Sequence, residues 1–186
     1  MTTWPGYQSL KRSLLATLTG QVLEIGAGNG ANLPLLPPAI DWTGLEPHPR
    51  ARRALSQAAT AAPGPRRILD AHAEAIPLPS ASIDVVLSTA VLCSVDNLSA
   101  VLSEVHRVLR PGGRFVFMEH VAAPPGSAFR RMQRMIAPIT RVVDRGCDPS
   151  RDLAPEIEAA FADVDLTRYT ASGLFKIPFI AGTAYP

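Results

Sequence analysis

The sequence lacks several features that would place it in a specialised class of protein. It has only two cysteines, which are too few for a disulfide framework. No run of about 18 apolar residues occurs, so no membrane-spanning helix is expected. Residues 1–7 lack the basic and apolar regions of a secretory signal, and a net charge of +2 gives no reason to expect a nucleic-acid partner. These absences predict a cytoplasmic protein without stable membrane insertion.

Short apolar runs alternate with helical patterns along the 186 residues, and 47% of these residues are hydrophobic, which is enough for one packed domain. The runs predict strands at 22–25, 42–45, 67–69, 83–88, 114–119, 163–169 and 177–184. The helical patterns cover 7–18, 49–61, 97–109, 127–143 and 155–161. Strands that alternate with helices form parallel units with both sheet faces covered. Ligands bind such sheets at the carboxyl ends of the strands, so functional residues are expected there.

A glycine-rich loop follows the first predicted strand. Residues 26–30 read Gly-Ala-Gly-Asn-Gly, and glycine lets the backbone turn tightly and lets a ligand approach closely. Glu46 ends the next strand, where a carboxylate can accept hydrogen bonds from both hydroxyls of a ribose. With Ala31 the loop also satisfies the dinucleotide fingerprint. The loop and the acid alone therefore fit either a dinucleotide or S-adenosylmethionine.

The residues around the loop favour S-adenosylmethionine. A pyrophosphate binds best at a helix N-terminus directly behind the loop, but residues 32–38 contain three prolines and make a poor helix. Glu24 would repel phosphates and suits a sulfonium ligand that carries a free amino group. Both lysines, Lys11 and Lys176, lie outside the middle of the chain, where a hydride-transfer apparatus would be expected, so a nicotinamide dehydrogenase is the weaker alternative.

Three segments resemble the motifs of class I S-adenosylmethionine-dependent methyltransferases. Residues 22–30 are similar to the first motif, residues 73–86 to the segment that leads into the fourth strand, and residues 104–113 to the turn into the fifth. The resemblance implies an α/β fold, a Rossmann-like doubly wound sheet of seven mostly parallel strands with an antiparallel last strand. It also implies a single domain over residues 1–186, with S-adenosylmethionine as the cofactor.

A narrower resemblance points to the thiol S-methyltransferase branch of the methyltransferase-like proteins. It rests on residues 92–95 and 117–122, and on the Gly146-Cys147 pair with Arg151. It implies methyl transfer to a small-molecule acceptor, first of all a thiol. The alternatives left open are N-, O- or C-methylation of a natural-product, quinone or phospholipid precursor, and a cofactor-binding regulatory protein without activity. A homodimer is also left open.

The family's motifs, carried onto this sequence, imply a set of cofactor contacts. These are Glu24, Gly26, Ala27, Gly28, Gly30, Glu46, Pro47, His72, Ala73, Glu74, Thr89 and Ala90. The loop would line the methionyl and ribose parts, and Glu46 would hold the ribose. His72 stands where many relatives have an aspartate for the adenine amino group. The adenine contact is therefore expected from the backbone at Ala73, with His72 or Glu74 beside it.

Residues for the methyl acceptor are expected near His120, which ends the fifth predicted strand. An imidazole with a pKa near 6.5 could accept a proton from a thiol with a pKa of about 8.5, which makes His120 the candidate base. The N-terminal helix within residues 1–20 and a lid over residues 124–155 should cover the acceptor. The residues expected to contact it are Tyr7, Met132, Arg134 and Met135.

The two cysteines could also suggest a redox or metal site. Cys93 and Cys147 lack the close spacing of cysteine ligands in zinc motifs. Both are therefore predicted to be small buried hydrophobic residues, and no metal site is predicted.

Overall fold

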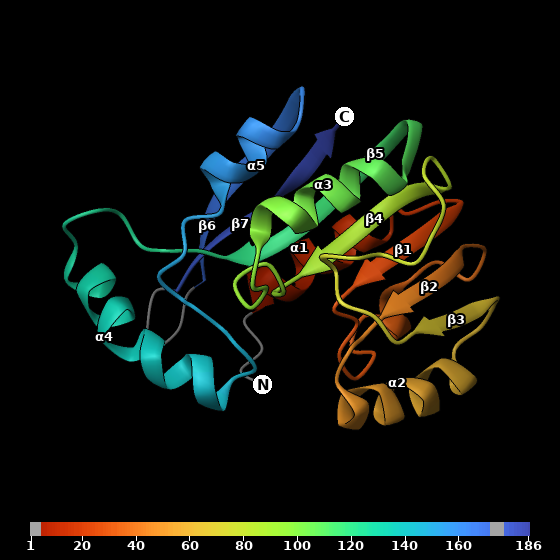
Figure 1. Ribbon diagram of the computed structural model, residues 1–186, viewed down its shortest axis with the longest axis horizontal. Coiled ribbons are helices and arrows are strands. Elements are labelled where there is room, and N and C mark those ends of the chain that lie inside the picture. Colours follow the sequence, from red (N-terminus) through yellow and green to blue (C-terminus); the bar gives the residue numbers. More distant parts are fainter. Residues whose placement is uncertain (1–4, 172–176) are drawn as a thin grey trace.

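The computed structural model describes residues 5–171 and 177–186, and every predicted helix and strand is present in this part of the chain (Figure 1). The strands are β1 (Gln21–Ile25), β2 (Asp41–Leu45), β3 (Arg66–Leu69), β4 (Ile83–Thr89), β5 (Leu109–His120), β6 (Asp163–Ala171) and β7 (Ile177–Tyr185). The helices are α1 (Pro5–Leu15), α2 (Pro49–Ala61), α3 (Leu98–Val108), α4 (Ala128–Val143) and α5 (Ala154–Ala160), with a short 3-10 turn at η1 (Leu33–Leu35). Residues 1–4 of the expected N-terminal cap lie outside the described residues.

All seven strands form one sheet in the order β3-β2-β1-β4-β5-β7-β6. The pairs from β3 to β5 are parallel, whereas β7 runs antiparallel to both of its neighbours, β5 and β6. The order reverses at β1, between β2 and β4, which is where a doubly wound sheet binds its ligand. The predicted seven-stranded, mostly parallel sheet with an antiparallel last strand is confirmed.

Helices cover both faces of this sheet. On one face α3 and α5 bury Val101, Val105 and Ile157 against the strands. On the other face α1 and α2 bury Leu15 and Leu55 in a second cluster. Figure 1 shows α3 in front of the sheet and α1 behind it. Because helices cover both faces of the sheet, a ligand can reach it at the carboxyl ends of the strands.

The start of β5 differs from the prediction. The strand was expected from residue 114, after a Pro-Gly-Gly turn, but it begins at Leu109, which pairs with Ile83 of β4. The pairing register of β4 and β5 shifts between Ile83 and Val85, so the Pro-Gly-Gly segment forms a bulge within β5. Gly113 lies here because a Cβ at this position would meet the carbonyl oxygens of β4 at 3.0 and 3.1 Å. The bulge lies at the end of β5 far from His120.

Helix α4 lies beside the sheet (Figure 1). Gln133 attaches it to the segment after β5, because its Oε1 accepts from the Ala123 N–H at 2.7 Å and its Nε2 donates to the Val121 carbonyl at 3.2 Å. On its outer side the apolar residues Met135 and Val142 are 77% and 83% exposed. Among the described residues, no helix has both the length and the hydropathy that crossing a membrane requires.

Candidate active site

A cavity of about 890 Å³ lies at the carboxyl ends of β1, β2, β4 and β5. This volume lies within the usual range for small-molecule sites. We call the part lined by Glu24, residues 26–28 and Glu46 the glycine-loop end, and the part lined by Tyr7, Cys93, His120 and Cys147 the histidine end. A second cavity of about 490 Å³ between α3 and α5 contains none of the predicted site residues. The strand ends therefore gather the site, as the fold predicts.

Glu46 organises the glycine-loop end. Its carboxylate is 3% exposed and accepts the Gly28 N–H and the His48 N–H, both at 2.8 Å. The Ala27 N–H donates to the Leu45 carbonyl at 2.9 Å, which ties the loop to the end of β2. Backbone hydrogen bonds therefore hold the Glu46 carboxylate at the cavity wall, where its remaining lone pairs can accept from a ligand.

Gly26 is required by both its conformation and its surroundings. Its φ is +58°, and a Cβ would meet both Val91 methyl groups at 2.6 Å. Gly28 has a similar φ of +59°, but a Cβ there would meet nothing nearer than 3.9 Å, so this position leaves room for a ligand. Gly30 has a different role, because a Cβ would meet Leu33, Leu55 and Ala58, and it does not line the cavity.

Glu24 is a buried acid in the wall of the same end. It is 2% exposed, and it accepts from Asn32 Nδ2 at 2.6 Å and from Trp42 Nε1 at 2.9 Å. Burial raises the pKa of Glu24 to about 7, although these two hydrogen bonds and the charge of Lys11 act in the opposite direction. Asn32 and Lys11 also line the cavity, although the sequence did not predict them as site residues.

This end fits S-adenosylmethionine on three observations. Asn32 Oδ1 is buried and has no hydrogen-bond partner among the described residues, so an N–H of a ligand would satisfy it. The Glu24 carboxylate can pair with the ammonium group of the cofactor, and Glu46 can accept from its ribose. The open space at Gly28 admits a close approach to the backbone.

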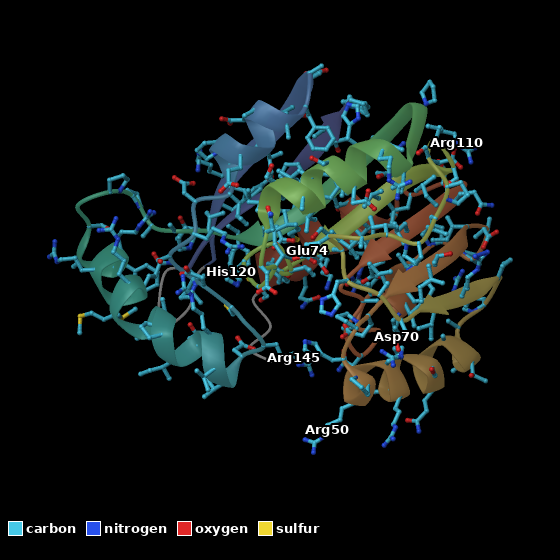
Figure 2. The ribbon with its side chains drawn as sticks, in the orientation of Figure 1. Arg50, Asp70, Glu74, Arg110, His120 and Arg145 are labelled. Atoms are coloured by element: carbon cyan, nitrogen blue, oxygen red, sulfur yellow. The ribbon has the colours of Figure 1, made fainter. Side chains whose placement is uncertain are left out.

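Two thiol sulfurs and an imidazole nitrogen lie close together at the histidine end. His120 Nε2 lies 3.0 Å from Cys93 Sγ and 3.5 Å from Cys147 Sγ. Both cysteines are buried, and His120 is partly buried. Phe179 packs edge-on against the imidazole with ring centroids 6.3 Å apart, and Tyr7 packs on Phe179. Figure 2 shows His120 at the carboxyl end of β5, on the side of the sheet where α4 lies.

The protonation of this cluster is coupled. A hydrogen bond between the two thiols, together with burial, raises the pKa of Cys93, and the same bond lowers the pKa of Cys147. Burial by itself would lower the pKa of His120, but its hydrogen bond with Cys93 and nearby negative charge outweigh this, so the pKa is raised. The sequence predicted that both cysteines are buried, which is confirmed, but it did not indicate their contact with His120.

Glu119 holds the loop that carries Cys93 in place, and the sequence did not predict this role. It is fully buried and accepts from Ser88 Oγ at 2.6 Å and from the N–H groups of Val91 and Leu92 at 2.8 and 3.1 Å. Burial raises the pKa of Glu119 to about 7 against these hydrogen bonds. The carboxylate thereby fixes the loop after β4, which carries Cys93. A glutamate inside an apolar strand was the available sequence signal.

The structure brings most of the predicted site residues to this cavity. Of the predicted cofactor contacts, those that line it are Glu24, Gly26, Ala27, Gly28, Glu46, Pro47, His72, Ala73, Glu74, Thr89 and Ala90. Tyr7 and His120 also line it. Met132, Arg134 and Met135 lie outside it on α4. From the predicted lid, residues 143–147 reach the cavity instead.

Glu74 and His72 occupy the part where adenine is expected. Glu74 Oε1 accepts from the N–H groups of Asp96 and Asn97 at 3.0 and 3.4 Å, directly before α3. His72 is exposed at the rim of the cavity. The Glu74 carboxylate therefore fixes the start of α3, while Ala73 between these residues is buried in the wall.

Comparison with known proteins identifies the family of this chain. The family model described as "Methyltransferase domain" matches residues 23–117. The rat (Rattus norvegicus) thiol S-methyltransferase TMT1B is 39% identical over 78% of this chain and 61% of its own length. The human (Homo sapiens) thiol S-methyltransferase TMT1B is 36% identical over 87% of the chain and 71% of its own length. A Methanosarcina mazei structure titled as a SAM-dependent methyltransferase superposes with a TM-score of 0.73 at 18% identity, covering 100% of this chain and 99% of its own.

The chain belongs to the methyltransferase domain family. It is a class I S-adenosylmethionine-dependent methyltransferase, and the predicted family and cofactor are thereby confirmed. The alternatives of a nicotinamide dehydrogenase and of a regulatory protein without activity give way to this assignment. The chain spans 61% of the length of the rat relative.

Proposed function

We propose that this methyltransferase transfers a methyl group to the sulfur of a small, fairly apolar thiol. The observation that carries the proposal is the histidine end, where an imidazole and two thiols face the same cavity as the glycine loop. The rat and human relatives named thiol S-methyltransferases support it, since both are more than a third identical to this chain.

The glycine-loop end holds the methyl donor. S-adenosylmethionine supplies a methyl group on a sulfonium sulfur, which a nucleophile displaces in line. Glu24 and Asn32 would bind the amino group, Glu46 the ribose, and Ala73 the edge of the adenine. The backbone hydrogen bonds of Glu46 fix its carboxylate before the ligand arrives. Positioning of this kind accounts for much of the rate in such reactions.

The histidine end receives the acceptor. Tyr7 and Phe179 supply an aromatic wall beside His120, which suits an apolar acceptor. His120 Nε2 can accept the proton that a thiol loses when its sulfur becomes the nucleophile. Residues 143–147 close this end from the side of α4, which supports the proposal that residues 124–155 act as a lid.

The experiment that tests this function measures transfer from labelled S-adenosylmethionine to thiols, phenols and amines of matched size. We expect transfer to apolar thiols to be roughly tenfold faster or more than to the other classes, because His120 and the aromatic wall favour them. Transfer to a phenol or an amine with none to any thiol would contradict the proposal.

A second candidate is methylation of a lipid-like acceptor with an anionic group. The exposed side of α4 favours it, because Met135, Ile139 and Val142 are 77%, 62% and 83% exposed beside Arg134, a pattern typical of helices that lie on membranes. A phospholipid precursor in anionic vesicles tests it against the same headgroup in soluble form. Turnover of the vesicle-bound acceptor alone would favour this candidate over the thiol.

A further inference from the structure

The histidine end collects three metal-ligand atoms from three separate segments. Cys93 comes from the loop after β4, His120 from the end of β5, and Cys147 from the loop after α4. Their ligand atoms, the two Sγ and an imidazole nitrogen, all lie within 4.8 Å of one another. Because the residues are 27 or more positions apart in the sequence, spacing alone could not indicate the cluster.

The distances match a cation of the zinc type. Bonds of about 2.3 Å to sulfur and about 2.0 Å to imidazole nitrogen place tetrahedral ligand atoms about 3.5–3.8 Å apart. The Cys147–His120 distance is 3.5 Å, and the Cys93–His120 distance of 3.0 Å needs to open by about half an ångström to match. Rotation of the Cys93 side chain is sufficient for a movement of this size.

Hydrogen bonds from the backbone and from the Arg151 side chain hold the three segments together. The Asp148 N–H donates to the Cys93 carbonyl at 2.9 Å, so the two cysteine loops are joined directly. Arg151 Nη1 donates to the carbonyls of Leu92 and Val95 at 2.9 and 2.8 Å, and the Ala122 N–H donates to the Arg151 carbonyl at 3.0 Å. The ligands are therefore preorganised, which lowers the cost of binding an ion.

The charge of the three ligands also favours a cation. Two thiolates and a neutral imidazole carry a charge of −2, which a divalent ion neutralises in a partly buried site. The Asp148 carboxylate beside Cys147 is already paired with Arg141 at 2.6 Å, so the negative charge available to an ion comes from the ligands themselves.

We propose that Cys93 Sγ, His120 Nε2 and Cys147 Sγ bind a zinc ion and leave its fourth coordination position open to the cavity. All three residues line the cavity, so the open position faces it. Three protein ligands with one open position are the pattern of catalytic zinc sites, whereas structural sites use four.

The open position would activate an acceptor thiol by coordinating its sulfur. This inference rests on the proposed function. The acceptor sulfur takes the fourth position, its S–H bond breaks, and the proton passes to solvent water. A metal-bound thiol is deprotonated at neutral pH, so the three ligands hold a thiolate toward the glycine-loop end. His120 then acts as a ligand, and the removal of the proton no longer requires it as a base.

Metal binding is tested without any turnover. The purified protein is incubated with zinc, separated from free ion by gel filtration and analysed for metal, and the cobalt(II) form is examined by absorption. We expect about one zinc per chain, with thiolate-to-cobalt charge transfer and the intense visible bands of tetrahedral cobalt. The C93S, C147S and H120Q variants should bind zinc roughly tenfold or more weakly, while H106Q, away from the cavity, should bind as the unaltered chain does.

The outcomes separate this inference from the proposed function. Calorimetry of S-adenosylmethionine binding shows whether each variant is folded, because the glycine-loop end lacks these three residues. A folded chain that binds no zinc, or whose cobalt form shows no thiolate charge transfer, overturns the metal site even if it methylates thiols. A chain that binds zinc through these residues but methylates no thiol supports the site and refutes the proposed function.

Discussion

The two ends of the cavity differ in how they are assembled. At the glycine-loop end, Glu24 and Glu46 are fixed by backbone and side-chain donors from adjacent parallel strands and the loops that follow them. At the histidine end, Cys93, His120 and Cys147 meet only because loops from distant parts of the chain are tied together. The first end is built on the strands β1 and β2 and the residues that follow them, and the second on the loops after β4 and α4 together with the end of β5. On the proposed function, this difference would separate binding of the methyl donor from choice of the acceptor.

The largest expected effect comes from removing the imidazole at the histidine end. H120Q should lower kcat/KM for an apolar thiol by roughly 10²–10⁴-fold, because the acceptor thiol loses the group that activates it, whether His120 acts as a base or as a zinc ligand. The dissociation constant of S-adenosylmethionine should change less than about twofold, because no cofactor contact is lost. Steady-state kinetics and calorimetry measure the two quantities.

The matched control for this variant is H106Q, since His106 lies beside Phe161 with ring centroids 6.2 Å apart and outside the site cavity. Equal loss of thiol transfer in both variants would mean that the imidazole of His120 has no special role. Loss of cofactor binding in H120Q would mean that the two ends are not separable.

The next effect is a pH dependence that arises at the glycine-loop end. Folding raises the pKa of Glu24 from its ordinary value of 4.5 to about 7, so between these values the folded chain binds more protons than the unfolded chain. The free energy of unfolding should therefore fall as the pH rises from about 4.5 to about 7, by up to about 3 kcal/mol from this group. E24Q should remove this part of the slope in cofactor-free urea titrations at pH 5 and pH 8.

E156Q, on the exposed side of α5, is the comparison for Glu24, because it removes one carboxyl group without altering the cavity wall. It should keep the slope of the unaltered chain. If E24Q and E156Q gave the same slope, the burial of Glu24 would not be what raises its pKa.

Cofactor affinity should respond more modestly to the loop itself. G26A places a methyl group 2.6 Å from Val91 in a backbone with φ of +58°, so we expect the dissociation constant of S-adenosylmethionine to rise roughly tenfold. G112A imposes a similar φ of +79° with no atom within 4 Å, in the first residues of β5 and outside the cavity. If the two substitutions weakened cofactor binding equally, backbone strain alone would explain the effect.

The smallest effect is expected on the outer side of α4. Arg134 and Met135 are exposed and outside the cavity, so R134S and M135S should change KM for a soluble thiol by less than about twofold and stability by less than about 0.5 kcal/mol. R53S, an exposed position on α2, gives the background. A clear rise in the KM for the thiol would mean that Arg134 and Met135 contact the acceptor, as the sequence predicted.

The fold was predictable because its signals are local. The apolar runs, the helical spacing and the Gly26–Gly30 loop each fix one element, and the alternation of strands and helices then leaves few topologies. Glu46 could be placed at the site because it ends the strand next to the loop. Gly30 was assigned to the ligand by the same motif, although its space is taken by Leu33 and Leu55.

The histidine end was predictable only in part. His120 could be placed because it ends a strand, but its contacts with Cys93 and Cys147 depend on how the loop after α4 folds back across the loop after β4. The amphipathic pattern of α4 is as compatible with an outer surface as with an inner one. The structure places residues 143–147 at the cavity and leaves Met135 outside, which local periodicity could not decide.

On the proposed function, S-adenosylmethionine and an acceptor thiol bind in one cavity, with the acceptor sulfur beside His120. The most direct measurement gives the enzyme a mercaptophenol, which offers a thiol and a phenolic oxygen on the same ring, and locates the transferred methyl group by NMR of the product. We expect the S-methyl thioether from the unaltered chain and from H106Q, with little product from H120Q. A product methylated on oxygen, or equal thioether yields from H120Q and the unaltered chain, would contradict it.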